Sequence, residues 1–263
     1  MLRNRIITAI ILAPLAVLAV FYLPLTWFGL LFWLVASLAL YEWAGLLHVK
    51  TPWGKLFYLF FFAVTAFCAY QVPEWYDEIL IIGCLVWVVA AAGVLLFPRF
   101  EQVYPRPFVL APLGLIIATV AWLAIMLVRQ QPDGEIWVVW MFLVVWGADV
   151  GAYFAGKQFG RTPLAASVSP KKTWEGVAGG LLLPGVVCGG AVFLWQENGL
   201  QWVVITVALI VISVFGDLFE SVLKRTTGVK DSGTLLPGHG GMLDRIDSLL
   251  AVLPFMAAIH VLS

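Results

Sequence analysis

The chain has 263 residues, a formal net charge of zero, a hydrophobic fraction of 62% and a charged fraction of only 11%. Its mean hydropathy of +0.99 lies far above the range of soluble globular proteins and indicates a polytopic membrane protein. Its three cysteines are scattered through apolar stretches without the spacing of metal ligands, so we assign them no disulfide and no metal. We therefore expect one all-α membrane domain over residues 1–263.

Apolar runs of the length that a membrane-spanning helix needs recur along the chain. We predict about nine spans, at residues 5–23, 26–47, 55–72, 79–97, 108–128, 135–156, 174–195, 201–222 and 246–262. Pro24 and the turn that it suggests separate the first two. The first run follows Arg3 and Arg5, as in a signal peptide, but it is long for one and lacks a clear cleavage site, so we keep it as a span.

The basic residues predict the orientation, because short loops rich in Lys and Arg stay in the cytoplasm. With the N-terminus inside, every Lys and Arg except Arg129 falls on the cytoplasmic side, and the C-terminus falls outside. Replacing Arg129 with Ala is then expected to have little effect on activity. A compact chain without a targeting sequence favours the inner (cytoplasmic) membrane of a bacterium, with the active site facing the cytosol.

The half of the chain before residue 131 is nearly all apolar spans and short loops, which is typical of a scaffold. Its one ionisable residue clearly within a span is Glu42, near the cytoplasmic end of the second span. A carboxylate in a membrane is costly and so a functional candidate. Near a helix end it can also bond to a neighbouring helix, and we favour that structural interpretation.

Polar residues enter the spans in the second half, residues 131–263. Asp149 lies in WGADVGAYFAGKQFG, where helical spacing puts Tyr153 on the same face and Gly156 near it. We favour a polar site over a merely helix-bridging role for this carboxylate. In the following loop, SVSPKKTWEG, Thr173 or Ser169 could cap the next helix. Lys171 and Lys172 could simply anchor the loop at the membrane surface, or could line a site for a polyanion.

The stretch from Ser221 to Ser248 concentrates charge and glycine between two apolar segments. Just before and within it, Asp217, Glu220 or Ser221, and Lys224 share one helix face. Asp244 and Asp247 share a face at the start of the last span, where acids also suit the helix dipole. These carboxylates can form a hard oxygen site suited to Mg²⁺.

Carboxylates for a divalent cation, basic side chains and a glycine-rich loop together indicate phosphate chemistry. The sequence contains no Walker motif, no GxGxxG fingerprint and no HExxH motif. The residues therefore predict a membrane enzyme that transfers a phosphoryl or nucleotidyl group to or from a lipid at the cytoplasmic interface.

The run S-x-L-K-R-x-x-x-x-K-D-x-G-x-x-L-P-G-H-G-G-x-x-D-R-x-D, residues 221–247, resembles the signature of the phosphatidate cytidylyltransferases. WGADVGAYFAGKQFG and SPKKTWEG resemble further parts of that family. The resemblance implies transfer of CMP from CTP to phosphatidic acid, with release of pyrophosphate and formation of CDP-diacylglycerol in phospholipid biosynthesis. It also implies Mg²⁺ as cofactor, with a monovalent cation such as K⁺ assisting.

The resemblance assigns roles to individual residues. The implied catalytic set is Asp217, Ser221, Lys224, Arg225, Asp244 and Asp247. Of these, the metal centre would comprise Asp217, Asp244, Asp247 and, as a further ligand, Ser221. The triphosphate or the leaving pyrophosphate would bind Lys224, Arg225, Lys230 and Arg245. Phosphates of the lipid or nucleotide would bind Lys171 and Lys172, Asp231 and His239 would orient the loop or contact the nucleotide, and Asp149 and Glu175 would support the substrates.

The expected partners are CTP, phosphatidic acid and membrane lipids. A homodimer is a possible assembly, and no nucleic acid is expected as a partner. A CTP-dependent lipid kinase is the nearest alternative and would release CDP and a lipid phosphate. A transporter of anionic solutes would use Glu42, Asp149 and Asp217 as coupling or substrate sites. Transport predicts polar residues through to the outer face, where the spans are almost wholly apolar.

Overall fold

The computed structural model describes residues 2–99, 101, 106–229, 232–233 and 240–261, and side chains from residue 11 onward within these ranges. The elements in chain order are α1 (Leu2–Tyr22), α2 (Leu25–Leu46), α3 (Pro52–Tyr70), η1 (Pro73–Trp75), α4 (Tyr76–Leu95), α5 (Pro107–Gln130), α6 (Gly134–Phe159), β1 (Pro163–Ala165), β2 (Ser169–Thr173), α7 (Trp174–Pro184), η2 (Gly185–Gly189), α8 (Gly190–Trp195), α9 (Gly199–Thr226) and α10 (Leu243–Val261).

Each predicted span corresponds to one helical rod in the described part of the chain, with α7, η2 and α8 forming a single rod. Seven rods within the described residues are long and apolar enough to cross a membrane. The other two are α1, of which only Ile11–Tyr22 counts as an apolar helix, and α10, which carries three charged residues near its start. The all-α polytopic membrane class is therefore confirmed, whereas nine crossings remain a prediction.

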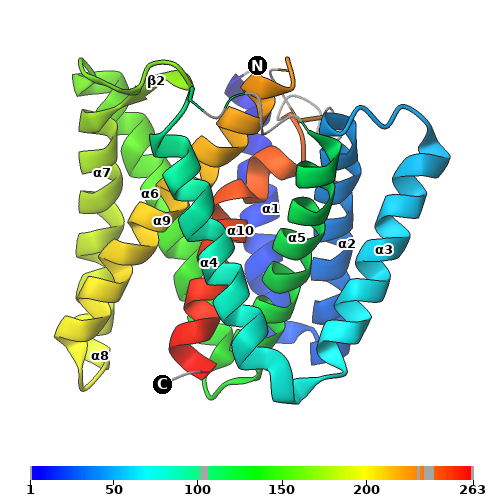
Figure 1. Cartoon of the computed structure of the whole chain (residues 1–263). Coiled ribbons are helices and arrows are strands. Elements are labelled where there is room, and N and C mark those ends of the chain that lie inside the picture. The colour runs from blue at the N-terminus through cyan, green and yellow to red at the C-terminus, as the bar shows by residue number, and fades with distance from the viewer. Residues whose placement is uncertain (1, 100, 102–105, 230–231, 234–239, 262–263) are drawn as a thin grey trace.

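The rods run alternately up and down the bundle (Figure 1). Helix α1 begins at the end where the β1–β2 hairpin lies, which we call the hairpin end, and α10 finishes at the opposite end. Helix α9 ends and α10 begins at the hairpin end. The described residues between them, 227–229, 232–233 and 240–242, therefore lie at the same end as the loop that carries Lys171 and Lys172.

Helix α10 lies at the centre of the bundle and packs against α9, α5, α4, α2 and α6. Its inner residues Ala251, Val252 and Met256 are fully buried. In a membrane, where helices gain little from apolar burial against each other, such contact depends on close packing and polar bonds. The polar start of α10 is thereby held against helices from both halves of the chain.

Glycines allow α6 and α7 to pack closely along their length. A Cβ atom added at Gly179 would lie only 2.7 Å from the carbonyl oxygen of Gly151, so neither helix could hold a larger residue there without moving. Further along the same rod, Pro184 is followed by the π-helical segment Gly185–Gly189, which interrupts a span that the sequence predicts as one continuous helix. Proline removes a backbone donor, and the wider π turn accommodates the loss.

The connection from α6 to α7 contains the one β-sheet of the described residues, which the sequence did not predict. Strands β1 and β2 pair antiparallel, with Pro163 opposite Thr173. Thr173 then caps α7, because its Oγ1 accepts a hydrogen bond of 3.1 Å from the backbone N–H of Gly176. Of the two predicted caps, Thr173 is the one that the structure confirms.

Candidate active site

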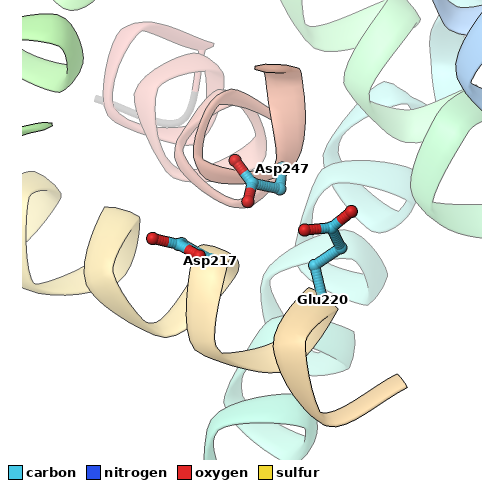
Figure 2. Close-up of side chains that lie close together, drawn as sticks. All are labelled: Asp217, Glu220 and Asp247. Carbon is cyan, nitrogen blue, oxygen red and sulfur yellow. The ribbon is translucent and has the colours of Figure 1, made fainter. Parts of the chain in front are cut away.

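Helices α9 and α10 bring three carboxylates together below the hairpin end. One oxygen from each of Asp217, Glu220 and Asp247 lies within 4.8 Å of the other two, and Figure 2 shows the three groups turned toward a common space. Asp217 and Glu220 are one helical turn apart on α9 and therefore share a face. Glu220 is buried, and its Oε1 has no hydrogen-bond partner among the described residues.

Lys224 joins this cluster to the start of α10. Its Nζ lies 2.6 Å from Glu220 Oε2 and 2.6 Å from Asp244 Oδ1. Asp244 Oδ2 also accepts hydrogen bonds from the N–H of Gly241, at 2.8 Å, and from the hydroxyl of Ser232, at 2.9 Å. The oxygens of Asp244 are thus engaged with Lys224 and the loop, whereas Glu220 takes the third place in the three-carboxylate cluster.

Residues of α6 and of the hairpin approach the same cluster. Lys172, from β2, forms an ion pair with Asp217. Asp149, from α6, lies within electrostatic range of Asp217, Lys172 and Arg245. The predicted convergence of the lysine loop with the α9–α10 region is therefore present for Lys172, while Lys171 is exposed on the same strand.

Two of the predicted substrate-binding residues hold the connection between α6 and α7 in place. Arg225 Nε donates a hydrogen bond of 3.1 Å to the carbonyl of Val168. Glu175 accepts hydrogen bonds from the backbone N–H groups of Arg161, at 3.1 Å, and Thr162, at 3.2 Å. Both contacts hold the connection that presents Lys172.

Two of the remaining predicted site residues, Ser221 and Arg245, lie within the described part of the chain, and three do not. Ser221 follows Glu220 on α9 and is partly buried, and Arg245 is exposed at the start of α10. Lys230, Asp231 and His239 lie outside the described residues, so their predicted contacts stay predictions.

The cluster suits a hard divalent cation by its chemistry. Its donors are carboxylate oxygens, Glu220 offers a buried oxygen without a described partner, and acidic side chains outnumber basic ones around it. Carboxylates so close together repel one another unless a cation or protons intervene. The residues therefore fit a Mg²⁺ ion that is bound by a few carboxylates and can also bind phosphate oxygens.

Sequence reasoning placed Glu220 on the right helix face but did not choose it as a cation ligand. The signal was its three-residue spacing from Asp217, which Ser221 matched with a spacing of four. Only the packing of α10 against α9 decides which side chain faces Asp247.

Fold and site together define an all-α polytopic membrane protein with a carboxylate- and lysine-lined site near one end of its bundle. The chain belongs to the Cytidylyltransferase family, whose family model matches residues 3–263. Among curated relatives, it is similar to the phosphatidate cytidylyltransferase of Pseudomonas aeruginosa, with 40% identity over 98% of this chain and 97% of the relative. It is also similar to those of Haemophilus influenzae, with 34% identity over 98% of both chains, and Brucella suis, with 37% identity over 95% of this chain and 90% of the relative.

Proposed function

We propose that the chain is a phosphatidate cytidylyltransferase, which transfers CMP from CTP to phosphatidic acid and releases pyrophosphate. The convergence of Asp217, Glu220 and Asp247 with Lys172 near the ends of membrane helices carries this proposal. The relatives of nearly full length that bear this name support the same reaction.

The reaction needs charge neutralisation and alignment more than acid or base catalysis. A phosphate oxygen of phosphatidic acid, already an anion, attacks the α-phosphorus of CTP, and the bond to the bridging oxygen of the β-phosphate breaks. The electron pair of that bond leaves with pyrophosphate. Because the attacking oxygen is already an anion, no proton needs to be removed from it. In-line placement of the two substrates is what the site must supply.

Asp217, Glu220 and Asp247 would hold Mg²⁺, and Asp244 would hold Lys224 beside them. When bound, Mg²⁺ would neutralise phosphate oxygens of CTP and of the leaving pyrophosphate. Lys172 approaches from the hairpin, where its ammonium group can turn from Asp217 to a substrate phosphate. We assign Lys171, Lys230 and Arg245 to the same phosphates, Asp231 and His239 to the nucleotide or its loop, and a supporting role to Asp149.

We further infer that the hairpin end faces the cytosol of a bacterium and that the chain crosses its inner membrane nine times. The rods alternate in direction (Figure 1), and the described segments with predicted cytoplasmic Lys and Arg residues lie toward the hairpin end, in accord with the positive-inside rule. The relatives come from bacteria. CTP would then enter from the cytosol, while phosphatidic acid enters from the inner leaflet.

The test is release of pyrophosphate by the purified protein in mixed micelles that contain CTP, Mg²⁺ and phosphatidic acid. We expect release that requires both the lipid and the cation, and none when EDTA is added. Release of CDP with formation of a lipid phosphate would instead identify a lipid kinase. Folded protein that gives neither product would refute the proposed reaction.

The variant Asp247→Asn tests the proposed cation site. It removes one negative ligand, so we expect a loss of at least about 100-fold in kcat. Asp77→Asn is the matched control, because Asp77 is an exposed acid in the first turn of α4 at the opposite end. Normal turnover in folded Asp247→Asn would refute a cation role for this residue.

A further inference from the structure

A buried carboxylate of the scaffold half touches the stretch that carries the site. Glu42, on α2, is 3% exposed. Its Oε2 accepts a hydrogen bond of 2.9 Å from the backbone N–H of Leu243, the first residue of α10, and lies 3.2 Å from the hydroxyl of Ser232. A carboxylate from one helix thus satisfies a free N–H at the start of another, where the helix dipole favours negative charge.

The backbone at Gly233 and Gly241 lies close to this carboxylate. A Cβ atom added at Gly241 would lie 2.7 Å from Glu42 Cδ, and one added at Gly233 would meet the same carboxylate. These two glycines belong to the signature stretch, and their lack of a side chain is what lets the backbone approach Glu42. Glu42 therefore makes close, specific contacts with this stretch.

A continuous line of polar contacts leads from Glu42 to the three-carboxylate cluster. The hydroxyl of Ser232 also lies 2.9 Å from Asp244 Oδ2, so its single proton is shared between the carboxylates of Glu42 and Asp244. Asp244 holds Lys224 at 2.6 Å, and Lys224 holds Glu220 at 2.6 Å. Each member touches the next, from α2 through the loop and α10 to α9.

The bond to a neighbouring helix that the sequence favours for Glu42 is present, but holding two helices together does not by itself require a buried polar side chain. Burying a carboxylate is costly, and apolar packing would hold α2 against α10 equally well. The described hydrogen-bond partners of Glu42 all belong to the stretch that carries Asp244 and leads into Asp247. The carboxylate instead fixes the position of the start of α10 relative to α2.

We propose that Glu42 is a positioning residue of the active site, which holds Ser232 and the first turn of α10 so that Asp244, Lys224 and Asp247 keep their places. This proposal rests on the proposed function, and it deepens it by giving the scaffold half a part in the site. Glu42 acts through hydrogen bonds to Ser232 and Leu243, not by contact with the substrates.

The test compares Glu42→Ala, Glu42→Gln and Ser232→Ala with wild type in detergent. Glu42→Ala removes the acceptor, so we expect kcat to fall about 10- to 100-fold and the Mg²⁺ concentration for half-maximal activity to rise. Glu42→Gln keeps an acceptor oxygen of the same reach, so we expect it to stay within about threefold of wild type. Ser232→Ala removes the hydroxyl that lies between Glu42 and Asp244 but keeps the bond from Leu243 to Glu42, so we expect an intermediate loss.

Ser37→Ala is the matched control, because Ser37 is also a buried polar residue of α2 and its hydroxyl has no hydrogen-bond partner among the described residues. We expect this variant to keep the kcat and the Mg²⁺ requirement of wild type. Equal losses in Ser37→Ala and Glu42→Ala would mean that any change in the buried part of α2 disturbs the protein, and would overturn the proposal.

The rise in Tm on addition of Mg²⁺ alone gives a readout that needs no turnover. We expect this rise in wild type, Glu42→Gln and Ser37→Ala, and a smaller one in Glu42→Ala. If wild type shows the rise but releases no pyrophosphate, the proposed reaction fails while the positioning role is still decided by the Tm values. An unchanged rise together with unchanged kcat in Glu42→Ala would overturn the positioning role.

Two further outcomes also decide the matter. Glu42→Gln as impaired as Glu42→Ala would mean that the site needs the charge of Glu42 rather than its hydrogen bonds, and would overturn the proposal. If Glu42→Ala does not fold, Ser232→Ala becomes decisive. A wild-type kcat and Mg²⁺ requirement in Ser232→Ala would then overturn the proposed positioning role.

Discussion

At the scale of single residues, the site depends on which carboxylates face a cation and which are occupied by protein groups. Asp244 is engaged by Lys224, Ser232 and the backbone of Gly241. Glu220 has one oxygen on Lys224 and the other buried without a described partner. A buried acceptor left unpaired is costly, and the cation of the proposed function would satisfy it.

Glu220→Gln should therefore weaken cation binding. The amide offers a neutral oxygen where the carboxylate offers charge, and we expect the Mg²⁺ concentration for half-maximal activity to rise about tenfold or more. The measurement is a Mg²⁺ titration of pyrophosphate release. Glu197→Gln, an exposed change at the opposite end of the bundle, serves as the control. An unaltered Mg²⁺ requirement in Glu220→Gln would remove this residue from the cation site.

At the scale of the helices, polar contacts at both ends of the bundle fix how the rods meet. At the hairpin end, Arg225 ties α9 to the β1–β2 connection, and Glu42 ties α2 to α10. At the opposite end, Arg129 of α5 pairs with Glu135 of α6 and donates a hydrogen bond of 3.1 Å from Nε to the carbonyl of Val20 in α1. One side chain there connects three helices.

Arg129→Ala should lower stability without changing the chemistry. Only 13% of the Arg129 side chain is exposed, so its loss leaves Glu135 and a carbonyl without their partner, at a cost of about 1–3 kcal/mol. We expect a lower Tm in detergent and a kcat close to wild type at temperatures where the variant is folded. A large drop in kcat at full folding would count against the placement of Arg129 away from the site.

At the scale of the whole molecule, the bundle keeps its polar chemistry at one end. The hairpin, the end of α9 and the start of α10 lie together there, while the outward helix faces carry exposed apolar residues such as Phe57, Val89 and Leu194. Exposed apolar side chains in such numbers suit contact with lipid tails. The carboxylate cluster thus lies toward one end of a bundle whose outer faces are apolar.

The orientation can be checked with single cysteines in a variant whose Cys68, Cys84 and Cys188 are replaced by Ser. Ala166→Cys lies in the hairpin and Glu197→Cys in the turn before α9, and both positions are exposed. We expect a membrane-impermeant thiol reagent to label Ala166→Cys only from the cytosolic side and Glu197→Cys only from the other. Labelling of both from one side would contradict the odd number of crossings between them.

Local sequence patterns are enough to predict the membrane class, the approximate place of each helical rod and the stretch that carries the charged residues of the site. Apolar runs and the spacing of charged residues are local properties, and a helix in lipid must satisfy its backbone within the same run. The residues of the 221–247 signature also indicated the family, which the full-length relatives then showed.

Which of these residues meet depends on how the helices pack. Residues 42 and 243 are far apart in the chain, and no local pattern pairs Glu42 with the start of α10 or chooses Glu220 over Asp244 as the neighbour of Asp217 and Asp247. The pattern of apolar residues likewise predicts neither the β1–β2 hairpin nor the π turn after Pro184. The physical reason is that side-chain partners across helices are set by the angle and depth at which the helices pack, which depend on the whole bundle at once.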